Sequence, residues 1–220
     1  MLLRDSIYDA LRAAILQCDL PPGQELREQD LAARYRVSRS PVRDALLRLE
    51  KGRLITVLPR QGYRVNPISL EDATEIFALR LIMEPACAAA AAQGKGVGRD
   101  VAALDAWRDA DGEDFVAYNR GFHAAVADLA GNGRMAAVVH DLIDQSDRLV
   151  RVSVASPEVA DRQLMAEHGA IIDAIQAGDA ALAERLMRAH VMGARDRVLT
   201  ALRDVPGCRP KTPVIRDNAA

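Results

Sequence analysis

The chain has 220 residues, half of them hydrophobic, 27% charged, with a formal net charge of -2. That is enough apolar material for a sizeable core, arranged most simply as two modest domains. The sequence has no apolar run long enough to cross a bilayer, and acidic residues interrupt the N-terminus where a signal peptide is apolar. We therefore expect a cytoplasmic protein. The three cysteines (Cys18, Cys87 and Cys208) lie far apart without a CxxC pair, which argues against a disulfide framework or a thiolate zinc site.

The net charge is unevenly distributed along the chain. Residues 1–66 contain 12 Lys and Arg against 8 Asp and Glu, whereas residues 67–220 contain 17 against 23. The first part is therefore basic (+4) and the second acidic (-6). A basic small domain joined to an acidic larger one is expected when only the first approaches a polyanion. By itself this signal is weak, because a charged helix face is more often simply solvated.

Three helices are predicted in the first part. Residues 5–17 place apolar side chains at helical spacing until "PPG" ends the pattern, and "REQDLAARYRV" supplies a second, short helix. After a brief turn, Ser38 or Ser40 can cap a third helix. Pro41 then lies in the first turn, where its missing N–H costs nothing.

The third helix has one apolar face and one basic face. Arg39, Arg43 and Arg48 fall outside its apolar stripe and must project outward. The stripe is formed by Val42, Ala45, Leu46 and Leu49. This order of helices is the helix-turn-helix plan, in which the start of the last helix enters the major groove of DNA. "ITVL" and "GYRV", separated by "PRQ", then predict a hairpin, or wing, with Arg60 at its tip.

These residue types suit DNA recognition. Arginine can donate two hydrogen bonds to the N7 and O6 atoms of guanine. Ser38 and Ser40 can bond phosphate, and the free N–H groups of a helix start add to an anion site. The alternative for any single arginine is a surface ion pair with Asp44 or Glu50. The set as a whole, on a three-helix scaffold, favours DNA.

The stretch "LPPGQELREQDLAARYRVSRSPVRDALLRLE" resembles the winged helix-turn-helix of GntR-type bacterial transcription regulators, in the branch typified by the fatty-acid regulator FadR. The resemblance covers about residues 6–65. It implies that operator DNA is contacted by Ser38, Arg39, Ser40 and Arg43, with further contacts from the wing residues Arg60, Gln61 and Gly62. Two positions depart from the family pattern. Gln29 stands where some relatives use an arginine on DNA, and Arg53 stands where a glycine usually ends the recognition helix, so Arg53 must adopt a conformation that glycine accepts more easily.

The second part begins after "NPIS". Ser69 is predicted to cap a helix, with Asp72 three residues later. Nearly everything beyond reads as helix, over residues 70–92, 99–110, 113–130, 134–154, 158–177 and 179–203. The expected fold is therefore mainly α, an N-terminal winged helix-turn-helix followed by an all-helical antiparallel bundle. The expected division is a DNA-binding domain at 1–66, an effector-binding domain at 69–203 and a loosely ordered tail at 204–220.

Three of the four histidines are placed to converge. Asn119 and His123 are four residues apart and share a helix face. His168 and His190 are each 11 residues from Asp179 in the "AGD" turn. If the flanking helices form an antiparallel hairpin, both rings lie roughly 16 Å from the turn, at the same height.

Each histidine alone is explained as readily by a buried, hydrogen-bonded polar residue, but the set favours a metal. Imidazoles suit Zn, Ni, Fe or Cu, and the Asn119 amide oxygen can add a ligand while leaving positions open. Three neutral histidines and a neutral asparagine leave the charge of a divalent ion uncompensated, so the open positions should accept an anion such as a carboxylate. His140, with Asp144 one turn later, is assigned to the surface.

Residues 70–203 resemble the FCD effector domain of the FadR branch, through "FALRLIMEPACAAAAA", "NRGFHAAVADLAGNGRM" and "EHGAIIDAIQAGDAALAERLMRAHV". The resemblance implies a divalent metal held by Asn119, His123, His168 and His190. Aspartate is commoner than asparagine at the first position, so the ion should be held less tightly here. A small organic acid is expected beside the metal, where Arg80 matches a pocket-facing arginine. The alternative for Arg80 is an ordinary i,i+4 pair with Glu84.

Two classes of function follow. The first is a homodimeric transcription regulator whose affinity for double-stranded operator DNA changes when a small carboxylate binds at the metal. The second is a metal-dependent enzyme acting on a small carboxylate, because an open His-ligated metal can activate water. The sequence places no acid as an evident general base, and an enzyme gives the basic N-terminal part no role.

Overall fold

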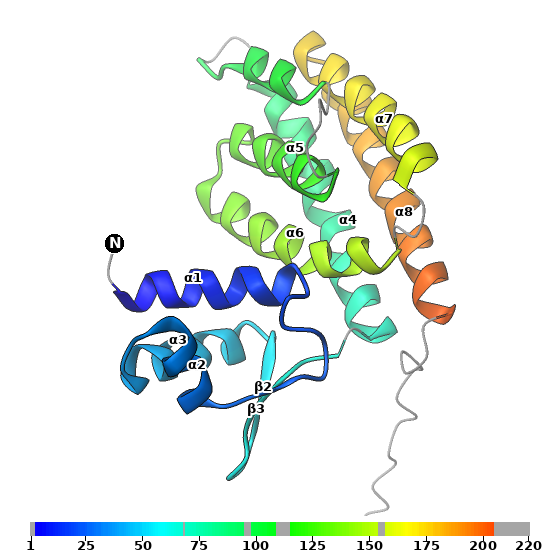
Figure 1. The fold of residues 1–220 in the computed structure, drawn as a ribbon. Helices are drawn as coiled ribbons and strands as arrows, with labels where there is room; N and C mark the ends of the chain where they lie inside the picture. Colours follow the sequence, from blue (N-terminus) through cyan, green and yellow to red (C-terminus); the bar gives the residue numbers. More distant parts are fainter. Residues whose placement is uncertain (1–2, 68, 95–97, 109–114, 154–156, 205–220) are drawn as a thin grey trace, which may run out of the picture.

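A computed structural model describes residues 3–67, 69–94, 98–108, 115–153 and 157–204 (Figure 1). A small N-terminal part, with three helices and a three-stranded sheet, lies against one end of a larger helical bundle. The expected mainly helical fold with a wing is confirmed. Asp204, predicted to begin the tail, is instead the last residue of the helix Ala180–Asp204; the rest of the predicted tail and Cys208 lie outside the described residues, whereas Cys18 and Cys87 are free thiols as expected.

The N-terminal part follows the predicted order of elements. Its helices and strands are α1 (Leu3–Leu16), β1 (Glu25–Leu26), α2 (Glu28–Tyr35), α3 (Arg39–Lys51), β2 (Ile55–Leu58) and β3 (Gly62–Val65). The predicted apolar stripe of α3, from Val42 to Leu49, is completely buried. It packs with Leu11 and Ile15 of α1 in a hydrophobic core that includes no residue beyond Val65.

The sheet has the strand order β1-β3-β2, with both pairs antiparallel. The predicted hairpin is confirmed residue for residue, with Ile55 opposite Val65 and Leu58 opposite Gly62. Strand β1 was not predicted, because two residues carry no periodic signal. Its Leu26 carbonyl oxygen lies where a Cβ on Gly62 would approach to 2.5 Å, and Gly62 has φ +118°. A side chain at position 62 would therefore clash as well as strain the backbone.

The conformation expected at Arg53 is also confirmed. Arg53 has φ 55°, in the left-handed region, whereas Gly52 before it has φ -76°. The arginine thus occupies the position that would favour glycine. Its backbone N–H bonds to the Glu50 carbonyl at 2.9 Å, which helps close the end of α3.

The helical bundle contains α4 (Leu70–Gln93), η1 (Val101–Trp107), α5 (Phe115–Leu129), α6 (Gly133–Ser153), α7 (Pro157–Ala177) and α8 (Ala180–Asp204). The start of α4 was predicted correctly, since Ser69 Oγ accepts a hydrogen bond from the Asp72 N–H at 2.9 Å. Residues 99–110 were expected to be an α-helix, but the described residues form a 3₁₀ turn over Val101–Trp107. The tighter turn is common in short connecting segments, where few hydrogen bonds sustain a full helix.

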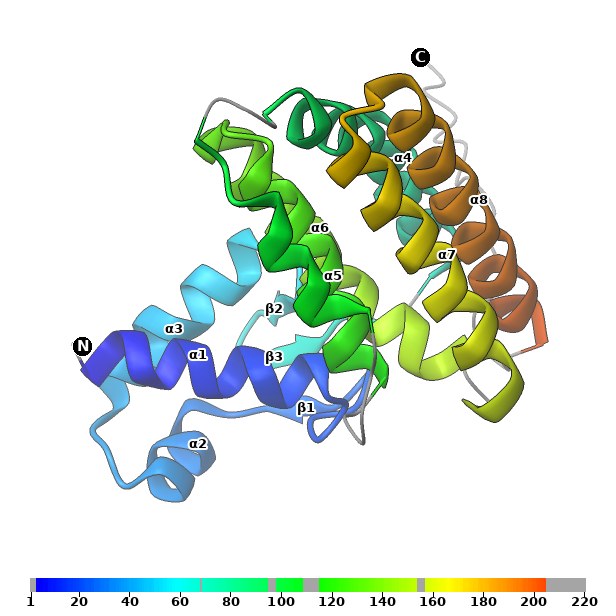
Figure 2. The same cartoon turned by 90° about the horizontal axis from the view of Figure 1, so that it is seen from above.

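Helix α4 is the centre of the bundle. It packs against α5, α6, α7 and α8, and together they enclose a second hydrophobic core formed by residues from Ala73 to Leu202. Helices α7 and α8 run antiparallel on one side, and α5 and α6 lie on the other (Figure 2). Gly178, with φ 80°, makes the turn between α7 and α8. No helix among the described residues combines the length and hydropathy needed to span a membrane.

Candidate nucleic-acid interface and metal centre

The start of α3 is exposed in the way that a recognition helix requires. Ser38 is the N-cap residue, in extended conformation, although its side chain makes no capping hydrogen bond. Ser40 and Arg39 follow in the first helical turn, and both are exposed. The Arg43 side chain, one turn on, is 59% exposed. All four predicted contact residues of α3 therefore lie on the solvent side of one helix end.

The arginines of this surface are paired with residues of α2, a possibility not considered from sequence. Arg43 donates two hydrogen bonds to Glu28, at 2.9 and 2.8 Å, and Arg39 donates one to Gln29 Oε1 at 3.1 Å. The expected alternatives, Asp44 and Glu50, are not their partners. Hydrogen bonding by Arg43 lowers the pKa of Glu28, which is therefore ionised at neutral pH. These contacts hold two guanidinium groups in place without burying them.

The Arg48 side chain also lies outside the apolar face of α3, but it contacts α1. Its guanidinium lies 3.7 Å from the centre of the Tyr8 ring and donates to Asp5 at 3.0 Å. This arginine therefore joins α1 to α3, which distinguishes it from Arg39 and Arg43.

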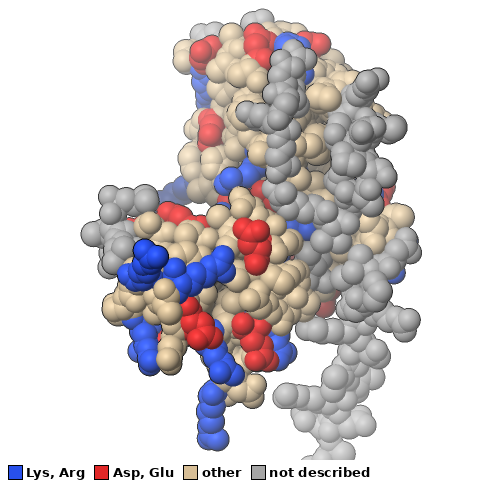
Figure 3. Space-filling view, in the orientation of Figure 1, with Lys and Arg blue, Asp and Glu red and all other residues tan. Residues whose placement is uncertain are grey.

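The wing presents its tip to solvent. Arg60, with φ 66°, and Gln61 are exposed, and Gly62 is partly buried under β1. The positive φ and the close approach of the β1 backbone therefore require glycine at position 62, independently of any contact with DNA. Figure 3 shows Lys and Arg projecting from this N-terminal part of the molecule, interspersed with acidic side chains.

Three histidines from three helices meet inside the bundle. His123 on α5, His168 on α7 and His190 on α8 are at most 3% exposed. The Nε2 atom of His190 lies 3.2 Å from the Nε2 atoms of both His123 and His168. The convergence expected from the mirrored spacing about the α7–α8 turn is therefore present.

The outer nitrogen of each ring faces an acceptor. His190 Nδ1 donates to Glu167 Oε2 at 2.8 Å, and His123 Nδ1 lies 2.5 Å from Glu84 Oε2. His168 Nδ1 lies 3.3 Å from the Tyr118 hydroxyl.

The protons of these three rings can be assigned from their partners. Carboxylates only accept hydrogen bonds, so Nδ1 carries the proton in His123 and His190. The Tyr118 hydroxyl donates to the Trp107 carbonyl at 2.8 Å, so its oxygen accepts from His168 Nδ1. When the rings are neutral, all three Nε2 atoms then present lone pairs to one another.

A metal ion fits this donor set. Imidazole nitrogens bound to one ion at 2.0–2.1 Å lie about 2.8 to 3.4 Å apart for octahedral or tetrahedral angles, a range that includes the two 3.2 Å separations. A cation would also turn the mutual repulsion of the lone pairs into attraction. The carboxylates on the outer nitrogens are the partners that commonly orient metal-bound histidines.

Protonation of His123 or His168 does not remove the repulsion between the Nε2 lone pairs at neutral pH. Burial lowers the pKa of His123 to about 4, against the attraction of Glu84, and burial also lowers the pKa of His168 well below its ordinary value. Both rings are therefore neutral at neutral pH. Phe122 stacks on His168, with ring centres 3.9 Å apart, and so helps fix the orientation of that ring.

Arg80 and Asn119 border the histidines. Asn119 is 8% exposed and lies one turn before His123 on α5. Arg80 is 1% exposed, and its Nε forms the i,i+4 ion pair with Glu84 that was considered as the alternative. Because Glu84 also contacts His123, it joins Arg80 to the histidine cluster.

Sequence reasoning missed three members of this centre: Glu84, Glu167 and Tyr118. Glu167 and Tyr118 stand next to His168 and Asn119 in the chain, but adjacency on a helix does not predict contact. Glu84 was considered only as a partner for Arg80. His140 lies outside the cluster, as expected: its side chain is 40% exposed and lies 3.0 Å from Asp128.

A charged bridge connects α5 to the N-terminal part. Asp144 of α6 is buried, and its two carboxylate oxygens each lie 2.5 Å from a guanidinium nitrogen, of Arg120 on α5 and Arg12 on α1. Arg120 follows Asn119 directly in the chain. A shift of α5 at the histidine cluster would therefore move Arg120, whose partner Asp144 is also paired with Arg12 of α1.

This fold defines a class of protein: a winged helix-turn-helix DNA-binding protein with a helical C-terminal domain. Comparison with known families agrees. Residues 3–65 match the gntR family of bacterial regulatory proteins, and residues 75–193 match the FCD domain. The chain belongs to the GntR family of transcriptional regulators, with an FCD domain as its C-terminal part.

Curated relatives resemble the chain over most of its length. An HTH-type transcriptional regulator from an unstable DNA locus of Streptomyces ambofaciens is 32% identical over 210 residues, which cover 89% of this chain and 84% of that protein. The HTH-type transcriptional repressor RspR of Escherichia coli K12 is 28% identical and covers 86% of each chain. Both relatives are described as transcription regulators, whereas neither is described as an enzyme.

Solved structures share the fold. Escherichia coli McbR/YncC aligns with a TM-score of 0.79 over 93% of this chain and all of that chain, at 21% identity. A GntR regulator from Rhodococcus sp. RHA1 aligns with a TM-score of 0.72 over 90% of this chain and 98% of that chain, at 24% identity. At these identities the comparison concerns the fold alone.

Proposed function

We propose that this regulator binds operator DNA through α3 and the wing, with an affinity controlled by a small organic acid bound at a metal in the FCD domain. The observation that carries the proposal is the convergence of the Nε2 atoms of three histidines in a buried site. The two separate hydrophobic cores support the proposed division into a DNA-binding domain at 1–66 and an effector domain at 69–203.

In the DNA-binding half, Arg39 and Arg43 would read base edges in the major groove. Ser38 and Ser40 would bond phosphate at the N-terminus of α3, with Arg60, Gln61 and Gly62 of the wing against the neighbouring groove or backbone. The two recognition helices of a homodimer would lie one DNA turn apart. A cytoplasmic location follows from the proposal, because the operator lies there.

In the effector half, His123, His168, His190 and Asn119 would hold a divalent ion such as Zn or Ni. The ion would supply a positive charge that attracts a carboxylate. Glu167 and Tyr118 accept from Nδ1 of His190 and His168, and the Glu84 carboxylate lies against Nδ1 of His123, which would leave each Nε2 to face the ion. These two carboxylates are thereby engaged in orienting rings, which favours a binding site over a hydrolytic one with a free general base.

The charges of the site indicate what kind of acid it would accept. Glu84 and Glu167 contribute two negative charges, Arg80 one positive and the ion two positive, which leaves a net charge of +1. A ligand with one carboxylate would neutralise the site. Arg80, held beside the cluster by Glu84, is proposed to contact that carboxylate.

The route from this site to DNA would be the bridge Arg120–Asp144–Arg12. Effector binding that shifts α5 would change the position of α1, which packs on α3. The operator affinity with and without effector would then differ by a coupling free energy.

Metal content tests the proposal most directly. Purified wild-type protein loaded with Ni or Zn should retain about one ion per chain after desalting, and His123→Ala and His168→Ala should lose it. His140→Ala is the matched control, because this histidine lies outside the cluster, and it should retain the ion. Full retention in both cluster variants would refute the site.

A thermal-shift screen tests which small acid is the effector. Metal-loaded protein is screened with small mono- and dicarboxylates, because a ligand that binds only the folded state raises the melting temperature. A monocarboxylate is expected to stabilise the metal-loaded wild type and to have no effect on His168→Ala. Stabilisation that is equal in both proteins would contradict binding at the metal.

A further inference from the structure

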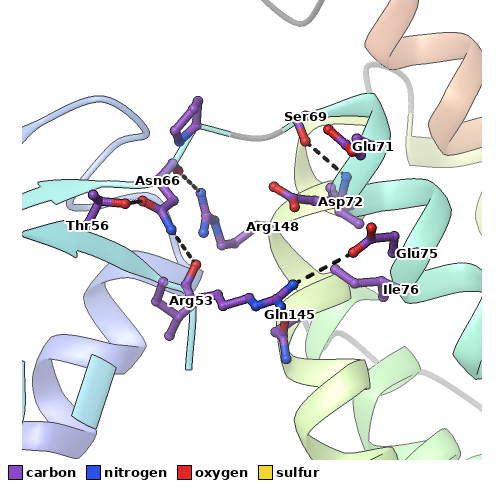
Figure 4. Close-up of a pocket in the computed structure, with 13 residues that line it drawn as sticks. Arg53, Thr56, Asn66, Ser69, Glu71, Asp72, Glu75, Ile76, Gln145 and Arg148 are labelled. Atoms are coloured by element: carbon purple, nitrogen blue, oxygen red, sulfur yellow. Dashed lines mark hydrogen bonds and ion pairs between the residues drawn. The ribbon is translucent and has the colours of Figure 1, made fainter. Parts of the chain in front are cut away.

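A cavity of about 290 Å³ lies at the junction between the N-terminal part and the bundle (Figure 4). Its walls come from the end of α3, strand β2, the connection before α4, the first turns of α4, and α6. The polar residues that matter for its chemistry are Arg53, Thr56, Asn66, Ser69, Gln145 and Arg148. None of the residues of the histidine cluster lines it.

Arg148 is the unusual member of this lining. It is 6% exposed, and its Nη2 donates to the Asn66 carbonyl oxygen at 2.6 Å. Its Nε–H has no hydrogen-bond partner among the described residues. Burial lowers the pKa of the Arg148 guanidinium, against the attraction of Cys18 and Asp72. An unpaired buried donor of this kind is costly unless something binds it.

The wall around Arg148 is fixed by hydrogen bonds. Thr56 Oγ1 donates to Asn66 Oδ1 at 2.6 Å, and Asn66 Nδ2 donates to the Arg53 carbonyl at 2.7 Å. Figure 4 shows the Arg148 guanidinium between Asn66 and the first turn of α4. The N-terminus of this 24-residue helix, capped by Ser69, adds a favourable dipole for an anion.

Acidic side chains limit the charge that the cavity accepts. Glu71, Asp72 and Glu75 line it but are exposed, and Glu75 lies 3.7 Å from Arg53. Water and salt screen exposed charges far more than buried ones. The buried guanidinium therefore favours an anion, while the acids at the rim disfavour one with several charges.

We propose that the cavity binds a small monocarboxylate through the Arg148 guanidinium, at a site separate from the metal centre. Carboxylates match the planar donors of arginine, and the volume is at the lower limit of small-molecule pockets. Because both parts of the chain line the cavity, the bound anion would stabilise their present arrangement.

The test observes the Arg148 Nε–H directly. Full-length ¹⁵N-labelled protein, stripped of metal by a chelator, is titrated with acetate while arginine Nε–H resonances are recorded. Arg148→Lys, which retains the charge but lacks Nε, identifies the resonance. We expect that resonance to shift saturably with acetate but not with chloride at equal ionic strength. No shift, or an equal shift with chloride, would overturn the proposal.

A second variant keeps the test valid if Arg148→Lys does not fold. Glu75→Gln removes a rim carboxylate and should tighten acetate binding by about 2- to 5-fold. Glu184→Gln, an exposed acid on α8 paired with Arg188, is the matched control and should have no effect. Equal acetate affinity in the two variants would overturn the proposal, and inorganic phosphate that binds more tightly than acetate would overturn the assignment to a monocarboxylate. None of these outcomes depends on the histidine cluster.

Discussion

Replacing Arg43 tests the proposed recognition surface and the pairing that the structure reveals there. The Arg43 side chain is 59% exposed and is held by two hydrogen bonds to Glu28. A bidentate contact between arginine and guanine contributes roughly 5- to 150-fold to affinity. An exposed ion pair contributes at most about 5-fold, so the guanine contact outweighs the loss of Glu28.

The expected net effect of Arg43→Ala is therefore a weakening of operator binding by up to roughly 30-fold after the lost ion pair is subtracted. Glu28→Gln should strengthen operator binding by up to about 5-fold. In this variant Arg43 has no ion pair to break before it contacts the DNA, and one negative charge near the DNA is removed. If Arg43 instead served only to hold α2 against α3, both substitutions would act through stability and in the same direction.

The assay begins with duplexes selected from a random-sequence pool by the wild-type protein. Fluorescence anisotropy then measures the affinity of each variant for the selected operator at several salt concentrations. Arg195→Ala removes a partly exposed arginine of α8, paired with its neighbour Asp196, and controls for net charge. Arg43→Ala that binds as tightly as Arg195→Ala would refute the groove assignment.

Three further substitutions test other parts of the structure. Gly62→Ala should lower the free energy of unfolding by about 1–3 kcal/mol in a urea titration, because its Cβ meets the β1 backbone and its φ is positive; Gly169→Ala, where nothing lies within 4 Å, should not be destabilising. Arg53→Gly should raise the melting temperature, by the equivalent of about 0.5–1 kcal/mol, because it relieves a left-handed conformation; a lower melting temperature would contradict this. Asp144→Asn should reduce the effect of metal and acid on operator affinity by about 2- to 30-fold, since it weakens the bridge from α5 to α1; undiminished coupling would exclude that route.

Much of the candidate site could be predicted because its signals are local. Helical periodicity placed Arg39 and Arg43 opposite the buried stripe of α3, and equal spacing from Asp179 placed His168 and His190 at the same height on a hairpin. The asparagine and arginine of the centre, Asn119 and Arg80, are buried near these histidines, and their roles stay predictions.

The contacts that complete each surface could not be predicted in the same way. Glu28 pairs with Arg43 across 15 residues, and Glu84 reaches His123 from another helix. Several acids were equally available to each of these groups in the sequence. Only the packing of α2 on α3, and of α4 on α5, selects among them.

By itself, the sequence determined most elements of this protein: the wing hairpin to the residue, the α-helices to within a few residues at their ends except over residues 99–110, the strained backbone at Arg53 and the level at which two histidines meet. Each of these depends on residues close together in the chain. Only the tertiary structure decided which nitrogen of each histidine is free to bind an ion, which acids hold the recognition arginines, and where the two parts enclose Arg148. These properties depend on side chains brought together from separate helices, whose relative positions no local pattern encodes.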